Sequence, residues 1–220
     1  MSSAPHARPN VFARLPPYLS RWFGYRATPP PKRPEYVVWF WSWIGAFCGL
    51  SVIMAVFGQA QYFLDRHVPL LVASYGASAV LIYGAIDAPL AQPRALVGGH
   101  AIGAVLGVCI TKLFHLLPPA RFASLRWLSA SISCATTIVA MQITGTTHPP
   151  AGATAVLPSV DDAFTELGWY FIPVVLLSSA LALAVALLVN NVQRRYPAFW
   201  IEAAKPGKLP RFMLVLSPAT

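Results

Sequence analysis

Residues 144–160 read TGTTHPPAGATAVLPSV, and this stretch interrupts the apolar sequence that lies on either side of it. Pro149 and Pro150 each lack a backbone donor and have a fixed φ, so the preceding helix cannot simply continue through them. A segment this short is also unlike a regular membrane span, which takes about 20 apolar residues. Because proline suits the first turn of a helix, Pro150 is well placed to open a new short helix near Ala151. The stretch therefore predicts a broken helix inserted between longer ones.

A second insert with the same pattern occurs earlier in the chain. The hexamer GASAVL at residues 76–81 matches GATAVL at residues 152–157 at five of six positions, and Ser78 stands opposite Thr154 at the sixth. Each copy follows one long apolar run and precedes another. We interpret the chain as two internal repeats, each consisting of a helix, a small-residue insert and a helix. Chance recurrence of an alanine-rich hexamer is the alternative.

The long apolar runs decide the class of protein. Hydrophobic residues make up 56% of the 220 residues and charged residues only 10%, whereas about 25% of an ordinary soluble domain is charged. These values exclude a soluble globule. The apolar runs cover residues 37–63, 95–117, 127–145 and 169–190, with the inserts at 70–86 and 144–160. We predict an all-α membrane protein with about four transmembrane helices plus two small-residue broken or re-entrant helices in two internal repeats.

The basic residues gather at the two ends of the chain. The formal net charge is +9. Basic residues flanking apolar helices fit the positive-inside rule and contact with anionic lipid, so we expect no nucleic-acid partner. We divide the chain into a basic, proline-rich tail on the cytosolic side (1–36), a transmembrane domain (37–190) and a basic C-terminal tail (191–220). The N-terminal tail weakly resembles an organelle transit sequence, but its prolines oppose a long amphipathic helix and favour a disordered basic tail. The choice between plasma membrane and organelle envelope stays open.

Charge also distinguishes two topologies. If both inserts enter and return on one side, 14 basic residues lie inside and two, Arg66 and Arg94, lie outside. If both inserts cross, the division becomes 12 against four. The first arrangement places Lys112 and Arg126 on the face of the basic tails and the acidic loop 161–168 on the opposite face. The positive-inside rule therefore modestly favours four crossings.

The inserts are the candidate substrate pathway. Free backbone amides at a helix start carry partial positive charge and bind anions. Two broken helices that meet near the membrane midplane are a recurrent way to build a transport site. The predicted pathway residues in the inserts are His148, Pro149, Pro150, Gly152, Ala153 and Thr154 in the second copy, and Gly76, Ala77 and Ser78 in the first.

Three further predictions concern single side chains. An imidazole at His148 could bind an anion, relay a proton or gate a pore. The alternative is a structural role in which it only caps or hydrogen-bonds the turn. His100 could line the same cavity or merely pack between helices. Arg94 could attract an anion at the outer face or anchor a lipid headgroup, and Asp87 would weaken that attraction by pairing with it.

The sequence offers little for catalysis, metals or cofactors. It contains no HExxH, no GxSxG and no glycine-rich phosphate loop, and every acidic residue lies at or outside an expected membrane boundary. Cys48, Cys109 and Cys134 lie in apolar segments without CxxC spacing, so we interpret them as reduced packing residues. We expect no enzyme activity, no metal and no cofactor.

Several ordered motifs resemble the HPP family of small integral membrane proteins. The name-giving tripeptide is His148-Pro149-Pro150, within THPPAGATA. WIGAF (43–47), GASAVLIYG (76–84), PLAQPR (89–94) and GGH (98–100) are also similar to that family, and the resemblance covers residues 37–190. It implies four transmembrane helices. Some plastid and cyanobacterial members are implicated in nitrite transport, so the resemblance implies that activity here as an expectation.

These observations lead to one hypothesis and two rivals. The hypothesis is a multi-pass transporter or channel for a small inorganic anion, with nitrite as the species that the resemblance implies. The first rival is a pore for a small neutral solute, and the second is a non-transporting assembly or adaptor protein. The expected partners are membrane lipid and the anion, and glycine-rich helix faces allow a homo-oligomer.

Overall fold

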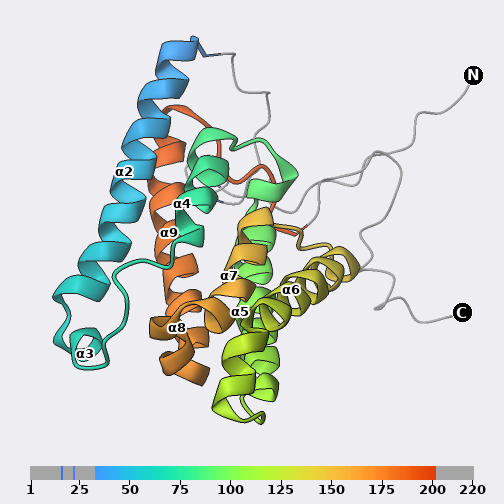
Figure 1. Cartoon of the computed structure of the whole chain (residues 1–220). Helices are drawn as coiled ribbons and strands as arrows, with labels where there is room; N and C mark the ends of the chain where they lie inside the picture. Colours follow the sequence, from blue (N-terminus) through green and yellow to red (C-terminus); the bar gives the residue numbers. More distant parts are fainter. Residues whose placement is uncertain (1–15, 17–21, 23–32, 202–220) are drawn as a thin grey trace, which may run out of the picture.

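The computed structural model describes Pro16, Trp22 and residues 33–201, and in this part the chain is all-α, as predicted (Figure 1). Most of the two basic tails assigned to 1–36 and 191–220 lies outside the described residues. The part of the second tail that is described packs on the helices: Arg194 and Tyr196 are buried, and the Tyr196 hydroxyl donates to the Ala91 carbonyl at 2.7 Å. The folded domain therefore extends beyond the predicted boundary at residue 190.

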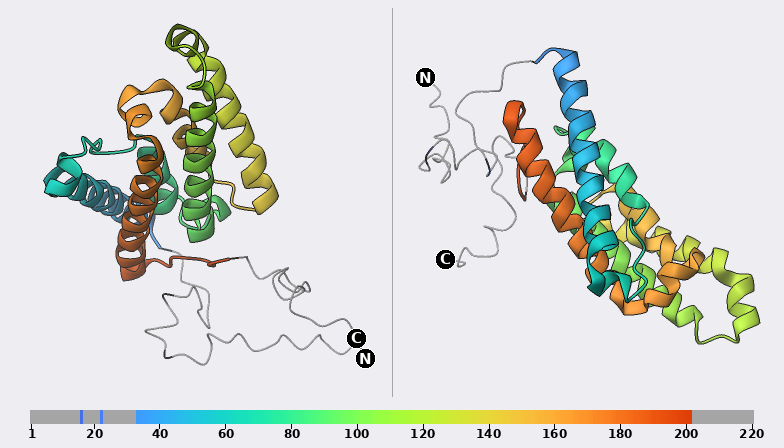
Figure 2. Two further views of the ribbon diagram at one scale, coloured as in Figure 1. Left: turned by 90° about the horizontal axis from the view of Figure 1, so that it is seen from below. Right: turned by 90° about the vertical axis from the view of Figure 1, so that its left-hand side faces the viewer.

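Four helices in the described part are long and apolar enough to cross a membrane, in agreement with the predicted number. They are α2 (Glu35–Gln59), α5 (Pro93–Phe114), α6 (Pro119–Thr144) and α9 (Phe171–Gln193), which follows α8 (Asp162–Leu167) and the 3₁₀ turn η5 (Gly168–Tyr170). α9 packs against both α2 and α5, and α5 packs against α6. Figures 1 and 2 show the resulting order α2, α9, α5, α6.

Proline and glycine set several helix ends. α5 and α6 each have proline at the first helical position, where the missing donor costs nothing. The segment between the apolar runs 95–117 and 127–145 is therefore helical from Pro119 onward. Gly145 ends α6 in the left-handed conformation with φ of 65°, which glycine adopts without a Cβ penalty.

The two inserts form the predicted broken helices. The first comprises α4 (Ser74–Ala79), which continues into the π-helical turn η3 (Val80–Gly84), and it is followed by the 3₁₀ turn η4 (Pro89–Ala91). The second insert is α7 (Pro149–Val160). α4 and η3 pack against α2, and η3 also packs against α9, whereas α7 packs against α5 and α6. The short helix α3 (Gln61–Leu64) follows α2.

The first insert runs from one end of the helix layer toward the other. We define the end that carries Glu35 as the upper end and the end that carries Gln59 as the lower end, as in Figure 1. The Tyr75 hydroxyl donates to the Val175 carbonyl at 2.6 Å, near the lower end of α9. Farther along the insert, the Tyr83 carbonyl accepts from Arg194 at 2.8 Å, at the upper end of α9. The insert therefore climbs beside α9 and emerges at the upper end.

The second insert descends in the opposite direction along α5. A Cβ added to Gly103 would lie 2.5 Å from the Ala151 carbonyl oxygen, and one added to Gly107 would lie 2.6 Å from that of Ala155. One turn lower, Thr111 and Ser159 are joined through their hydroxyls at 2.7 Å. Glycine at these positions lets the two backbones approach closely.

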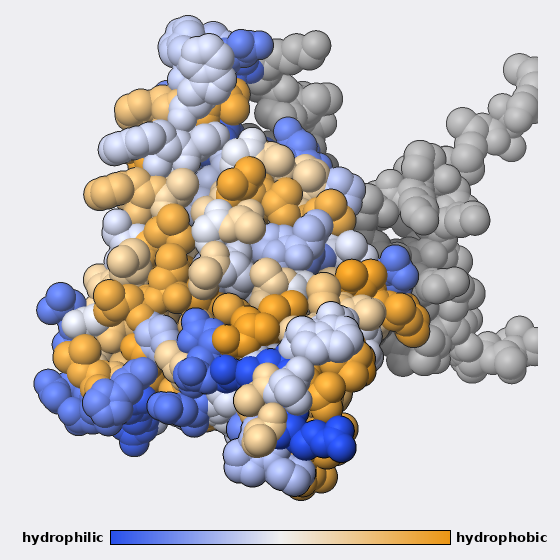
Figure 3. Space-filling view, viewed as in Figure 1, coloured by the Kyte–Doolittle hydropathy of each residue, from blue (hydrophilic) through white to orange (hydrophobic). Residues whose placement is uncertain are grey.

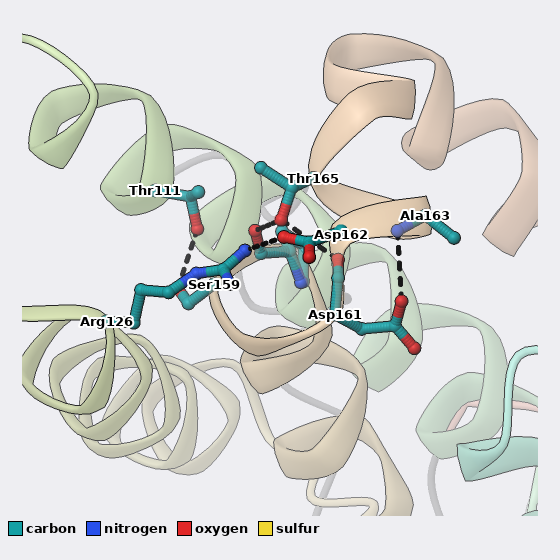
Figure 4. A network of polar contacts seen from close by, with 8 residues as sticks. Thr111, Arg126, Ser159, Asp161, Asp162, Ala163 and Thr165 are labelled. Carbon is teal, nitrogen blue, oxygen red and sulfur yellow. Dashed lines mark hydrogen bonds and ion pairs between the residues drawn. The ribbon is translucent and has the colours of Figure 1, made fainter. Parts of the chain in front are cut away.

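The polar contacts at the lower end contradict the favoured four-crossing topology. Arg126 forms an ion pair with Asp162, which lies in the acidic loop (Figure 4). The four-crossing arrangement places these two residues on opposite faces of the membrane. In the described residues, the chain instead passes between the two ends six times, four times in long helices and twice in the inserts. Hydrophobic length alone missed this because α4 with η3, and α7, are each shorter than a regular membrane span.

Charge and hydropathy on the surface follow this arrangement. Among the described basic residues, Arg66, Lys112, Arg121 and Arg126 lie at the lower end, as expected if both inserts cross. Hydrophilic residues gather at the lower edge of the face shown in Figure 3, around α3 and α8, and apolar residues cover much of its middle. Large apolar side chains such as Trp43, Phe47 and Ile143 are exposed, as expected of a lipid-facing surface.

Candidate functional site

The two inserts meet at a buried pair of histidines. The Ser78 hydroxyl, from α4, lies 2.7 Å from Nε2 of His100 in α5 and 2.9 Å from Nε2 of His148, which caps α7. The two imidazole centroids are 5.0 Å apart. All three side chains have zero exposure. One hydroxyl therefore bridges two titratable groups inside the protein.

Hydroxyls from both copies of the hexamer bind His100. Thr154 Oγ1 lies 2.8 Å from His100 Nδ1 and 2.7 Å from the Ser74 hydroxyl. Ser78 and Thr154, which occupy equivalent positions in the two hexamers, therefore bind the two nitrogens of a single imidazole. The one mismatch between the hexamers preserves the hydroxyl that this contact uses.

The chain of contacts has a single proton order when both histidines are neutral. His148 Nδ1 lies 2.8 Å from the Leu90 carbonyl oxygen, which only accepts, so Nδ1 carries the proton and Nε2 accepts from Ser78. The Ser78 proton is then used, so His100 donates from Nε2. His100 Nδ1 accepts from Thr154, and Thr154 accepts from Ser74. Every direction follows from the Leu90 carbonyl.

The same contacts can carry one added proton. A proton that reaches Ser74 can be passed by successive transfer through Thr154, His100 and Ser78 to His148 Nε2. His148 then becomes a cation, and His100 stays neutral but exchanges its tautomer. Each hydrogen bond in the relay persists with its direction reversed, so no donor loses its acceptor. We name Ser74, Thr154, His100, Ser78 and His148 the histidine relay.

Packing holds the rings of the relay in place. The Tyr75 ring stacks on His100 with centroids 4.3 Å apart, and its hydroxyl contacts the Ser179 hydroxyl at 2.6 Å. A Cβ at Gly99 would lie 2.7 Å from the Cβ of His148. The second glycine of the GGH motif therefore lets α5 approach His148 closely.

The structure brings together only some of the predicted pathway residues. His148, Thr154, Ser78 and His100 meet in the relay. Ala77 and Ala153, the residues just before the two hydroxyls, are exposed and point away from it. Gly152 is buried, and a Cβ there would lie 3.4 Å from the sulfur of Cys134 on α6.

The helix starts offer fewer amides than the sequence suggested. α7 begins at Pro149 instead of near Ala151, so its first two residues have no N–H to offer. The next amide, of Ala151, already donates to the His148 carbonyl at 2.9 Å. In the first insert the Gly76 amide donates to the Ala73 carbonyl at 3.1 Å. The inserts therefore meet through side chains, with these amides used within the backbone.

Arg94 lies at the upper end, together with the start of α2, and not with Arg66 on the opposite face as the favoured topology predicts. Its guanidinium donates to the Thr144 carbonyl at the end of α6 and to the Ile201 carbonyl at 3.1 Å. A cation at a helix C-terminus complements the helix dipole. Asp87 acts electrostatically on Arg194: burial lowers the pKa of that guanidinium, and the Asp87 charge opposes the shift.

Sequence reasoning missed three members of the site. Ser74 and Tyr75 lie in the first insert but before the hexamer that drew attention to it. Ser74 could have been found because it lies one helical turn before Ser78, on the same face. The contact with the Leu90 carbonyl could not be predicted from the sequence, because every residue has a backbone carbonyl.

A pocket of about 310 Å³ opens at the lower end between α5, α7 and α8. Its lining includes Val108, Thr111 and Pro158. Lys112 and His115 supply its basic groups, and the Lys112 ammonium lies 5.9 Å from the Trp169 ring centroid. We name this pocket the lower vestibule. In the described residues no group of three or more His, Cys, Asp or Glu side chains is placed to hold a metal ion.

The comparisons with known proteins agree with the family that the tripeptide at the start of α7 indicates. The family model described as HPP, transmembrane region, matches residues 31–197. The chain belongs to this family. The match covers all six passes described above and ends just beyond α9, within the segment that packs Tyr196 onto the helices.

Two relatives are named as transmembrane proteins. Both are from Dictyostelium discoideum, and they are 37% and 35% identical to this chain over 186 residues, or 83% of its length. The matched region covers 63% of one relative and 57% of the other, so the chain spans about three-fifths of their length. No solved structure matches the chain. Family, relatives and helices agree that this is an integral membrane protein.

Proposed function

We propose that this protein transports a small inorganic anion, with nitrite as the first candidate, and that the histidine relay carries a proton linked to transport. The observation that carries the proposal is the meeting of both inserts at His100 and His148. Titratable side chains are costly within a membrane and usually mark substrate or proton pathways. We propose transport in preference to catalysis, because the relay joins the two inserts and contains no carboxylic acid that could act as a catalytic acid.

The arrangement of the two halves supports this proposal. α2 and α6 open the two halves and run in opposite directions. The first insert packs between the opening helix of its own half and α9, which closes the other half. α7 likewise packs between α6 and α5. Opposed halves that exchange partners around broken helices are characteristic of secondary transporters, in which one half rocks against the other.

The lower vestibule supports an anionic substrate. The Lys112 ammonium lies at its lining, and a positive charge in a concave site raises the local concentration of anions. Nitrite carries one delocalised charge and accepts hydrogen bonds. A proton on His148 would supply the counter-charge, so that one proton and one anion cross together without net charge movement.

The test is nitrite entry into proteoliposomes that contain the purified protein and an internal pH dye. We expect saturable entry above that of empty vesicles, with internal acidification that tracks entry. His148→Gln should abolish entry while keeping a polar side chain. His67→Asn is the matched control, because His67 is exposed in the loop after α3, has a positive φ that asparagine tolerates, and lies outside the relay.

The outcomes separate the proposal from its rivals. Entry that is unchanged in His148→Gln would remove the role of the relay. Uptake of neutral urea at a rate that ignores the anion and the pH gradient would favour a neutral-solute pore. No entry under any imposed pH gradient or potential would remove nitrite and favour an assembly or adaptor protein.

A further inference from the structure

α6 carries a row of hydroxyls toward α5 and α7 that the histidine relay does not use. Ser129, Ser133 and Thr137 recur at every fourth residue and all have zero exposure. We infer that this row lines the passage of the transported anion between the lower vestibule and His148. This inference rests on the proposed function for the identity of the solute. We name Ser129, Ser133 and Thr137 the hydroxyl row.

The lower end of the row joins the lower vestibule. Ser129 lies 2.8 Å from the Ser159 hydroxyl, which in turn lies 2.7 Å from that of Thr111. Thr111 is part of the vestibule lining, and its contact with Ser159 is visible in Figure 4. A continuous set of hydroxyls therefore leads from the pocket onto α6.

The upper end of the row reaches the relay. Met141 is one turn beyond Thr137 on the same buried face. A Cβ at Gly99 would lie 3.3 Å from the Met141 sulfur and 2.7 Å from the Cβ of His148. Ser129 and Thr137 are separated by about 12 Å along the helix axis, at 1.5 Å per residue. Met141 therefore lies between the top of the row and His148.

The middle of the row points to a ligand. Ser133 Oγ and Thr137 Oγ1 are buried and have no hydrogen-bond partner. A buried hydroxyl without a partner is unusual in native proteins and costs free energy. Other hydroxyls on α6 avoid this cost: Ser131 donates to the Trp127 carbonyl at 2.8 Å. Both unpartnered groups lie on the inner face, above the Ser129 hydroxyl that is bonded to Ser159.

Hydroxyl donors define the class of solute. A small anion whose oxygens accept hydrogen bonds can take one donor from each turn as it moves. Water could occupy the same positions while the anion is absent. No acidic side chain belongs to the row, so an anion meets no like charge along it.

The experiment measures water access and nitrite occupancy at single positions. Ser133→Cys and Thr137→Cys are each made in a full chain whose Cys48, Cys109 and Cys134 have been replaced by alanine. The probe is methyl methanethiosulfonate, an uncharged reagent that reacts with thiolates. The matched controls are Ser131→Cys and Thr136→Cys, because these neighbouring positions are exposed on the outer face of α6.

We expect the row positions to react at least about tenfold faster than the controls, because a thiol facing lipid stays protonated and unreactive. Nitrite at saturating concentration should slow that reaction. In flux assays Ser133→Ala and Thr137→Val should lower nitrite entry about tenfold at limiting concentration, whereas Ser131→Ala should not.

The outcomes test the passage, its occupant and the proposed function separately. Reaction at the row no faster than at the controls would overturn the passage. Fast reaction without protection by nitrite would overturn the anion as its occupant and leave a water-filled path. Absence of nitrite entry in the unmodified protein, with fast reaction at the row, would overturn the proposed function and not the passage.

Discussion

Replacing Ser78 by alanine removes the hydroxyl that joins the two inserts at the histidine pair. In the unmodified protein this oxygen accepts from His100 Nε2 and its proton is donated to His148 Nε2. Both partners have zero exposure, so water cannot replace the hydroxyl without rearrangement. The variant therefore leaves one buried donor and one buried acceptor without a partner.

The expected loss follows from these two groups. Each buried polar group left unpaired costs about 1–3 kcal/mol. Partial relaxation of the two rings reduces the sum, and we expect a loss of about 3 kcal/mol in the free energy of unfolding. For a chain of this size, that corresponds to a fall of roughly 6–12 °C in the melting temperature. Ser78→Thr keeps the hydroxyl and should recover most of the loss.

The assay is thermal unfolding of the purified protein in detergent, read by the reactivity of its three partly buried cysteines. Ser131→Ala is the control, since it deletes an exposed hydroxyl that bonds only to the preceding turn of its own helix. The tautomers give an independent readout: nitrogen NMR should show His148 protonated at Nδ1 and His100 at Nε2. A melting temperature equal to that of the control, or a His148 protonated only at Nε2, would refute the proton order of the histidine relay.

Four other variants test the packing and the topology. Gly103→Ala should lower the melting temperature, because its Cβ would meet a backbone oxygen of α7 at 2.5 Å. Gly76→Ala has nothing within 4 Å of the new Cβ, so it should leave stability unchanged or raise it by about 0.5–1 kcal/mol; equal effects of the two would contradict the close approach of α5 and α7. Arg126→Cys combined with Asp162→Cys should be joined by a short bifunctional thiol reagent, detectable by gel mobility, whereas a topology with these residues on opposite faces predicts no cross-link. Tyr196→Phe loses a buried hydroxyl bond of 2.7 Å and should lower the free energy of unfolding by about 1 kcal/mol, measured by the same melting assay; an unchanged melting temperature would show that the segment after α9 does not stabilise the domain.

Local chemistry was enough to predict the class of fold and the positions of the two inserts in the chain. Apolar runs of sufficient length can form only helices in a membrane, because every backbone group must be satisfied within the segment. Pro149 and Pro150 remove donors wherever they occur, so the break in the second insert was predictable from two residues. The hexamer match directed attention to Ser78 and Thr154, although their shared partner could not be read from it.

The direction of the inserts and the partners of each polar group depend on contacts between distant segments. A short insert that returns and one that crosses have the same composition, and the charge rule separated them by only two residues. The Arg126–Asp162 ion pair, between residues far apart in the chain, distinguishes them. The Leu90 carbonyl likewise sets the proton order of the relay, and a backbone oxygen carries no sequence signal. Hydrophobic length is a property of one segment, whereas proton order and topology belong to pairs of segments that only packing brings together.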